Sequence, residues 1–349
     1  MASEKQISAS CLNIITVLII SISCLFLPVL SIPLLRNWKS LATIKEVNQK
    51  GPYLGLITVY PPEEDAFFAI GAFKPDPRHP YVDISGRRFR IGKVEGRKVI
   101  YVRCGVGLVN AAAATQQMLD IFNIIGILHF GISGNLNSSL SIGDVLIPKS
   151  FVQTGLWDWL KPNATMPTND VAELHIGKYN VPVGDGHNLL GLIGYSTEQF
   201  YSESGNPNNP QRTSWFEVTE SWFQSASILE GLELQQCVNS SFCLPEKPKL
   251  VIGLNATTSD SFIDNAAYRN FLLSTFHVSS TDMESAAVIM TSLSNGFPVL
   301  VIRGLSDLAG AQSGNNTVRV FGALAATNVA NAVVRFVQTF KGSDSPIFL

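Results

Sequence analysis

Residues 281–287 read TDMESAA, and residues 301–307 read VIRGLSD. The second stretch closes an apolar run with β character, Phe297 to Leu305. Asp307 follows this run directly, so we expect it at the carboxyl end of a strand, where open α/β sheets bind ligands. The alternative is that Asp307 only caps the next helix, which is common for an Asp after a strand.

Glu284 in the first stretch precedes a helical pattern, Ser285 to Leu293. The small residues at the start of this pattern would allow a ligand to come close to the helix. The N–H groups at a helix start leave room for a polar ligand, although a first-turn Glu can also simply complement the helix dipole. Considered with Asp307, Glu284 predicts one pocket that both carboxylates face.

Short apolar runs alternate with helix-period segments from Pro52 onward, which is typical of an α/β sheet rather than of a β-sandwich. Between about Gln153 and Lys247 the pattern weakens, and Glu217–Leu232 alone has a helical period there, with a core-packing face. We therefore predict a single α/β domain over residues 51–345, with a central twisted mixed sheet flanked by helices. The expected strands are Tyr53–Val59, Phe89–Val94, Lys98–Cys104, Ile124–Phe130, Val145–Pro148, Lys249–Leu254 and Phe297–Leu305, and the other expected helices are Asn110–Phe122, Ser285–Leu293 and Ala323–Phe340.

Two glycine-bearing loops follow neighbouring expected strands. Gly105 and Gly107 stand where a strand turns into a helix, so backbone N–H groups there could cradle an anion or a ribose. Residues 131–135, which include Ser133 and Gly134, repeat the device after the next strand. One such junction occurs in any tightly wound α/β protein, but two side by side indicate a site.

In this order and spacing the motifs resemble the nucleoside phosphorylase and methylthioadenosine/S-adenosylhomocysteine nucleosidase superfamily, over roughly residues 51 to 340. The resemblance implies that Met283 and Glu284 grip a ribose. It also implies that Ser306 and Asp307 address a purine, with Asp307 protonating the ring as it leaves.

The remaining motifs fit the same family. Phe262 and Ile263 lie in a segment, Gly253 to Asn265, that resembles the one where an aromatic ring packs on the purine. The loop with Gly105 and Gly107, and the loop with Ser133 and Gly134, resemble the family's two glycine loops.

Hydrolytic members of this family use a Glu shortly after the first strand to activate water, and the candidates are Glu63 and Glu64. Pro61 and Pro62 lengthen the spacing from strand to acid by about two residues, and a base must come within hydrogen-bond reach of its water, so the shift could disable it. Phosphorolytic members hold phosphate with an Arg at the position where this chain has His129. A neutral His here is better explained as a packed residue than as a phosphate ligand, so hydrolysis is favoured over phosphorolysis.

Three functions follow from the resemblance. The first is a purine nucleosidase that cleaves the N-glycosidic bond of a nucleoside such as methylthioadenosine. The second is a non-catalytic storage protein, because the leader, residues 157–159 and the long aromatic insertion are most similar to the plant bark storage and vegetative storage branch. The third is a phosphate-dependent nucleoside phosphorylase. The family's habit of assembling also implies a homo-oligomer.

Composition narrows the partners. The chain has 349 residues, of which 15% are charged, and a net charge of −2. This charge composition has no excess of basic residues that would bind nucleic acid, so a small molecule is the expected partner. The His and Cys spacing fits no metal site, and we expect neither metal nor other cofactor.

Residues 1–35 are expected to be a targeting segment. Cys11 to Leu35 carries no charged residue and could span a bilayer core of about 30 Å, so a signal anchor is the alternative to the favoured signal peptide. Residues 36–50 are expected as a linker. Entry into the secretory pathway would place the protein in the vacuole or outside the cell, unless residues 11–35 anchor it to a membrane.

Sequons and cysteines support the same route. Cys237 and Cys243 are close enough to form a disulfide in an oxidising compartment, whereas Cys104 is expected to be buried in a strand. Five sequons could carry glycans, at Asn137, Asn163, Asn239, Asn255 and Asn315.

Overall fold

The computed structural model describes residues 40–161, 164–165, 170–176, 191–310 and 317–340. The expected targeting segment, residues 1–35, lies outside the described residues. Within the expected linker, residues 40–50 are helical, and Ile44 and Val47 are buried in the main hydrophobic core.

The centre of the molecule is a mixed sheet whose middle strands are β5 (Arg97–Arg103), β1 (Tyr53–Thr58), β6 (Ile124–Asn135) and β20 (Val299–Leu308). Strand β1 runs parallel to both β5 and β6, and β20 runs parallel to β6. Every residue of β1 is buried, as expected for a strand covered on both faces.

Shorter strands extend the sheet on both sides. On one side β4 (Arg87–Val94) pairs with β5 and is followed by β2 (Phe73–Pro75) and β3 (Tyr81–Ile84). The other side continues from β6 through the following strands: β19 (Ser280–Asp282), β18 (Asn255–Thr258), β8 (Ser150–Gln153) and β14 (Trp215–Glu217), with β7 (Val145–Ile147) and β17 (Leu250–Ile252) branching off β20.

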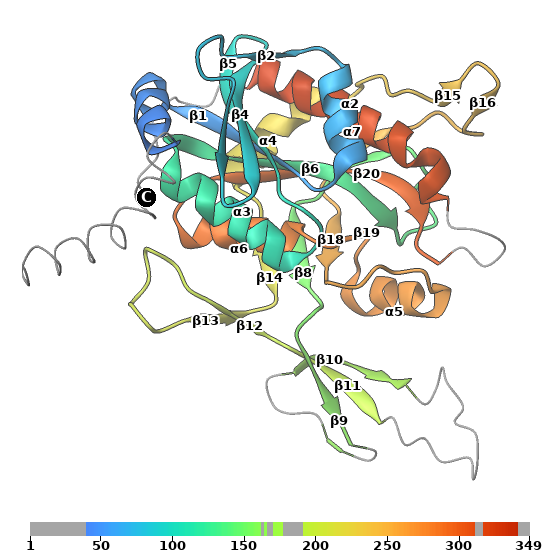
Figure 1. Ribbon diagram of the computed structural model, residues 1–349. Helices are drawn as coiled ribbons and strands as arrows, with labels where there is room; N and C mark the ends of the chain where they lie inside the picture. Colours follow the sequence, from blue (N-terminus) through green and yellow to red (C-terminus); the bar gives the residue numbers. More distant parts are fainter. Residues whose placement is uncertain (1–39, 162–163, 166–169, 177–190, 311–316, 341–349) are drawn as a thin grey trace, which may run out of the picture.

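Two pairs of helices cover the sheet (Figure 1). Helix α2 (Pro61–Ala69) packs with α7 (Val318–Thr339), and α3 (Leu108–Ile121) packs with α6 (Ser285–Ser294). Figure 1 shows the two pairs on opposite sides of the central strands. A mixed sheet flanked by helices confirms the predicted fold class.

The region between about Gln153 and Lys247, where the sequence pattern weakens, forms small elements of its own. Strands β9 (Trp157–Leu160), β10 (Asp170–His175) and β11 (Leu192–Ser196) make an antiparallel sheet that projects from the body in Figure 1. A hairpin of β12 (Glu198–Phe200) and β13 (Gln211–Thr213) follows, and α5 (Ala266–Phe276) lies after β18.

The helix expected over Glu217–Leu232 is wrong in extent. Glu217 is taken by the ladder of β14 with β8, so the helix α4 starts only at Glu220 and ends at Ser225, where a 3-10 turn from Ala226 to Leu229 follows. The expected core-packing face is confirmed, because Trp222, Ala226 and Leu229 are buried.

A second difference concerns residues 131–135, which were expected to form a loop. They continue β6, because β20 pairs with them on one side and β19 on the other, up to Asn135. The site therefore has a strand, not a loop, along one wall.

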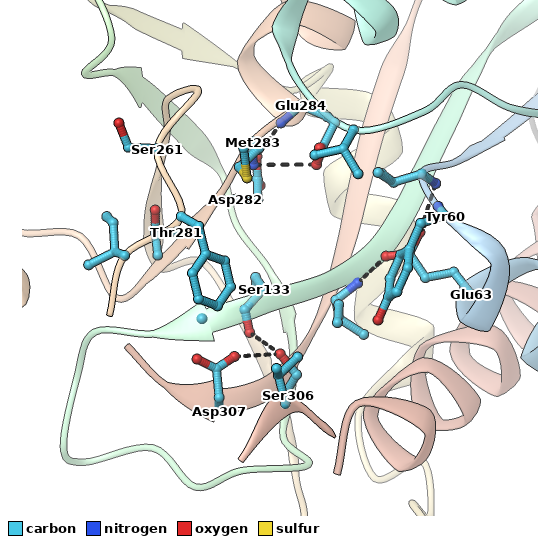
Figure 2. A pocket seen from close by; sticks show the side chains of 17 residues that line it. Tyr60, Glu63, Ser133, Ser261, Thr281, Asp282, Met283, Glu284, Ser306 and Asp307 are labelled. Atoms are coloured by element: carbon cyan, nitrogen blue, oxygen red, sulfur yellow. Dashed lines mark hydrogen bonds between the residues drawn. The ribbon is translucent and has the colours of Figure 1, made fainter. Parts of the chain in front are cut away.

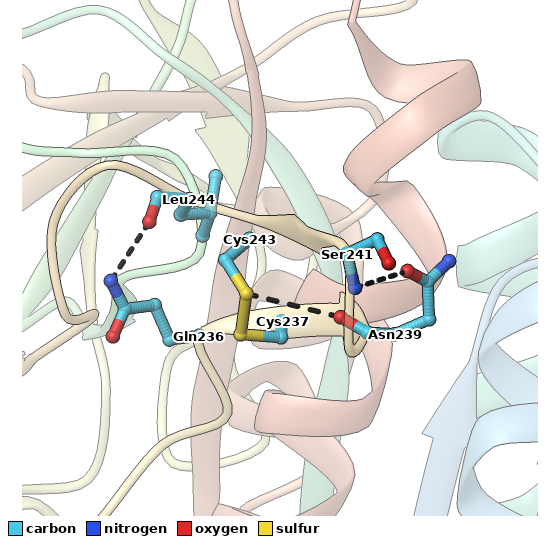
Figure 3. The surroundings of a disulfide bond; sticks show 6 residues. All are labelled: Gln236, Cys237, Asn239, Ser241, Cys243 and Leu244. Atoms are coloured by element: carbon cyan, nitrogen blue, oxygen red, sulfur yellow. Dashed lines mark hydrogen bonds between the residues drawn. A yellow bond between two sulfur atoms is a disulfide. The ribbon is translucent and has the colours of Figure 1, made fainter.

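The expected disulfide is present between Cys237 and Cys243, and Cys104 is buried and free. The bond closes the hairpin of β15 (Cys237–Asn239) and β16 (Phe242–Cys243), which Figure 3 shows at close range.

Candidate functional site

A cavity of about 220 Å³ opens near the carboxyl ends of β1, β6, β19 and β20 and the start of α6. Figure 2 shows Asp307 and Ser306 on one side of it, Glu284 and Met283 on the opposite side, and Tyr60 and Glu63 on a third. The lining residues come from segments far apart in the sequence: Val59, Tyr60, Glu63, Val106, Ile132, Ser133, Gly134, Ser261, Phe262, Ile263, Thr281, Asp282, Met283, Glu284, Ser306, Asp307 and Val318.

The structure brings most of the predicted site residues together here. Glu64, Gly105 and Gly107 are the predicted ones that do not line the cavity. Those that do are Glu63, Ser133, Gly134, Phe262, Ile263, Met283, Glu284, Ser306 and Asp307.

Asp307 is placed by an irregularity in β20. Leu305 pairs with Ser133 and Asp307 with Gly134, so Ser306 is the extra residue of a bulge, a device that re-aims side chains next to sites. The hydroxyl of Ser306 donates to Asp307 Oδ1 at 2.7 Å or to Ser133 O at 3.2 Å. Asp307 is thus buried, and the Ser306 hydroxyl next to it fixes the orientation of its carboxylate.

Glu284 is the residue before the first turn of α6, on the opposite side of the cavity from Asp307. Its Oε1 accepts a hydrogen bond of 3.0 Å from Gly107 N, and its Oε2 lies 3.5 Å from Arg303 Nη2. Burial raises the pKa of Glu284 to about 7, although Arg303 acts in the opposite direction. This carboxyl can therefore exchange a proton near neutral pH.

Glu63 reaches the cavity despite the two prolines before it. Pro61 and Pro62 occupy the first two positions of α2, where proline is well tolerated, and the third position is Glu63. Its side chain turns back, so that Oε2 accepts from Val59 N at 2.7 Å and Oε1 from Ile132 N at 2.7 Å. Burial raises the pKa of Glu63 against the lowering effects of Arg303 and these N–H groups.

Glu64 faces the other way. It forms ion pairs with Arg90 and Arg103 on β4 and β5 and is not part of the cavity wall. Of the two acids that the sequence left open, only Glu63 stands where it could act on a ligand.

The backbone N–H groups at the glycine junction before α3 already donate to side chains of the protein. Gly107 N donates to Glu284, and Leu108 N donates to Asp260 Oδ1 at 2.7 Å. The expected cradle for an anion at this helix start is thus used to hold two carboxylates, which agrees with the preference of helix N-termini for negative charge.

Behind the cavity lies a buried cation that the sequence analysis missed. Arg303 is fully buried, and its Nε lies 3.2 Å from Asp282 Oδ2. Its Nη2 lies 2.6 Å from Nε2 of His129, which is also fully buried and does not line the cavity. An Arg within an otherwise apolar strand is the signal that could have revealed this cluster, because a buried charge needs partners.

Gly131 lets this cluster form. A Cβ at Gly131 would lie 2.6 Å from Arg303 Nη1 and closer still to Glu63 Oε1. The backbone of β6 can therefore pass between the guanidinium and the Glu63 carboxylate only as glycine.

The cavity has unused polar groups and no lining cation. Ser133 Oγ and Thr281 Oγ1 are buried without a hydrogen-bond partner among the described residues. None of the described residues that line the cavity is Lys or Arg. The site therefore suits a neutral polar ligand better than a phosphate.

Comparison with protein families gives a match over most of the chain. The family described as the phosphorylase superfamily matches residues 53–338. Bark storage protein A of Populus deltoides is 35% identical over 288 residues, which cover 82% of this chain and 88% of that protein. A 5'-methylthioadenosine/S-adenosylhomocysteine nucleosidase of Listeria monocytogenes is 26% identical over 257 residues, 73% of this chain and 88% of that protein.

Solved structures show the same fold at lower identity. The 5'-methylthioadenosine/S-adenosylhomocysteine nucleosidase of Helicobacter pylori, bound to butyl-thio-DADMe-Immucillin-A, has a TM-score of 0.57 and 18% identity, covering 82% of this chain and 98% of that one. The enzyme of the same name from Colwellia psychrerythraea, in complex with adenine, has a TM-score of 0.57 and 21% identity, covering 82% and 95%.

Proposed function

Since this chain belongs to the phosphorylase superfamily, in the branch of the plant bark storage proteins, we propose that it hydrolyses the N-glycosidic bond of a purine nucleoside such as methylthioadenosine. The observation that carries the proposal is the placement of Glu63 in the same cavity as Glu284 and Asp307.

The chemistry assigns one role to each carboxyl group. Asp307 donates a proton to the purine ring while the bond between the ring nitrogen and ribose C1' breaks, and the electron pair stays on the purine. Glu63 accepts a proton from water as the water oxygen bonds to C1'. Glu284 accepts hydrogen bonds from the ribose hydroxyls, and Phe262, which is 61% exposed at the cavity edge, stacks on the base.

Hydrolysis is favoured over phosphorolysis by the charge of the cavity. Glu63, Asp282, Glu284 and Asp307 face it, and the guanidinium of Arg303 behind it is already surrounded by protein acceptors. A phosphate dianion would meet carboxylates instead of cations there. His129, which stands where phosphorolytic relatives would hold phosphate, is packed against Arg303 and away from the cavity.

The test is release of free base from methylthioadenosine, adenosine and inosine by the purified protein lacking residues 1–35, with and without phosphate. Release without phosphate is expected, and Asp307→Asn should abolish it. Glu284→Gln should mainly weaken substrate affinity. Strict dependence on phosphate would favour the phosphorylase alternative, and nucleoside binding without any release would favour storage.

We also propose that the protein follows the secretory pathway. The disulfide between Cys237 and Cys243 supports this, because such bonds persist in oxidising compartments. Asn239 lies in the same hairpin and is exposed, so it can carry a glycan, whereas Asn137 and Asn255 are only partly exposed and hydrogen-bonded to Ser279 and Ser150. Asn163 and Asn315 lie outside the described residues.

Expression of the full chain in a eukaryotic secretory host tests this route. A glycosidase-sensitive mass on the peptide that contains Asn239, lost in Asn239→Gln, is the expected result. An unmodified protein found in the cytosol would contradict it. N-terminal sequencing of the same material decides between a cleaved leader and an anchor, and light scattering tests the expected homo-oligomer.

A further inference from the structure

We propose that His129 is a positioning residue, whose neutral imidazole fixes the Arg303 guanidinium and, through it, the carboxyl groups that act on the nucleoside. The inference rests on the proposed function but concerns a residue that does not touch the cavity. Each of the two ring nitrogens of His129 has a hydrogen-bond partner.

The partners of His129 define its tautomer. Nδ1 lies 3.0 Å from the backbone oxygen of Ile57, which can only accept, so Nδ1 carries the proton. Nε2 is then an acceptor, and it lies 2.6 Å from Arg303 Nη2, which can only donate. His129 is thus neutral, with both nitrogens satisfied in a fully buried site.

The groups around His129 keep it neutral. Burial and the Arg303 charge hold the pKa of His129 well below its usual range, and Asp282 opposes them only partly. A protonated ring would place two cations in contact without solvent, and Nε2 could no longer accept from Arg303. The imidazole can therefore hold the guanidinium without competing for its carboxylates.

Arg303 distributes its donors over several elements. Nε and Nη2 lie 3.1 Å and 2.9 Å from Ser285 Oγ at the start of α6, and Nη1 donates to Ile132 O at 3.2 Å. The contact with His129 is the shortest of these hydrogen bonds. Because a buried guanidinium is costly to leave unpaired, loss of this acceptor should let Arg303 reorient.

One guanidinium serves three carboxyl groups. Asp282 pairs with Nε, Glu284 lies near Nη2, and Glu63 faces Nη1 across Gly131. The positive charge of Arg303 lowers the pKa of each of the three acids. A displaced Arg303 would therefore alter both the group that holds ribose and the group that receives the proton of water.

The test compares two variants of similar size. His129→Gln keeps an acceptor that can reach Arg303, and His129→Leu removes it. We expect His129→Leu to lower kcat/KM by about 10- to 100-fold, because a hydrogen bond to a charged group is lost. The acid limb of its pH profile should move to higher pH, because Glu63 loses part of the charge that keeps it ionised. His129→Gln should stay within a few fold of wild type, with the wild-type profile.

Either of two results would overturn the proposal. One is a folded His129→Leu protein with unchanged kcat/KM and pH profile. The other is equal impairment of both variants with equal loss of melting temperature, which would mean that the imidazole only fills space. If His129→Leu does not fold, nitrogen NMR of the wild-type imidazole decides: a protonated Nε2 at pH 6 contradicts the proposal, and an unprotonated one supports it.

Failure of the proposed function would look different. Wild-type protein would then release no base at all. In that case the affinity for methylthioadenosine, measured by calorimetry, replaces turnover, and it should fall about tenfold in His129→Leu but not in His129→Gln.

Discussion

The two sides of helix α2 carry adjacent glutamates with opposite fates. Glu63 is 3% exposed and turns into the cavity, where backbone N–H groups of Val59, Tyr60 and Ile132 hold it. Glu64 turns outward to Arg90 and Arg103. The same side chain, one residue apart, is a candidate base on one side and a surface ion pair on the other, so the surroundings assign the role.

The largest expected effect is a difference in kcat between variants of these two glutamates. Glu63→Gln should lower kcat by about 10²- to 10⁴-fold, as expected for loss of a general base. Glu64→Gln is the matched control and should stay within about twofold, because the cavity is untouched. Steady-state base release measures both, and a comparable loss in the two variants would refute the assignment of Glu63.

The next effect concerns Glu284, which lines the same cavity as Glu63. The folded state raises its pKa from 4.5 to about 7, so the stabilisation from its proton is complete below pH 4.5 and is lost as pH rises to about 7. The free energy of unfolding should fall through this window by on the order of 3 kcal/mol from this group. In Glu284→Gln this loss should be absent.

Denaturant unfolding at pH 5 and pH 8 measures this difference. Glu64→Gln serves again as the matched control, because it removes a carboxylate outside the cavity. Equal slopes in wild type and Glu284→Gln would show that Glu284 does not retain its proton.

A smaller effect is expected from adding a methyl group at two glycines, one beside the Arg303 and Glu63 side chains and one in the packing against α7. Gly131→Ala should cost roughly 1–3 kcal/mol in stability and also most of the activity, because the added carbon meets Arg303 and Glu63. Gly304→Ala meets Val329 and the backbone of Ala325 on the α7 side, so it should cost stability alone. Urea unfolding combined with base release tests this, and equal activity losses at equal stability would contradict it.

The smallest effect is expected on the outer side of α2. Glu64→Gln removes two partly exposed ion pairs, which are worth less than about 1 kcal/mol and weaken with salt. Melting temperatures in low and high salt should differ for wild type more than for the variant. A loss well above this value would mean that Glu64 has a structural role that these ion pairs do not explain.

The sequence predicted the parts of the fold whose signal is local. The strand that carries Asp307, the helix after Glu284 and the disulfide of Cys237 follow from residues close to them. The extent of β6 was missed because residues 131–135 are strand only through their pairing with β19 and β20. The glycines there suggested a loop, but Gly131 instead leaves room for the side chains of Glu63 and Arg303.

The site shows the same division. Motifs placed Met283, Glu284 and Asp307 correctly in one cavity, but no local pattern could choose between Glu63 and Glu64. The choice depends on the direction of α2 relative to β6. His129 was expected to be packed, but its contact with Arg303 could not be predicted. The two residues are 174 positions apart and meet only through the pairing of β20 with β6.

The contact of Gly107 with Glu284 joins segments 177 residues apart, and that of Leu108 with Asp260 joins segments 152 apart. Closing such long loops costs chain entropy, so these contacts are expected to form after the local hairpins and helices. A chain refolding from denaturant should then regain its circular dichroism before it can hold a nucleoside. Ligand binding would report the last step of assembly, when the two halves of the sequence have met.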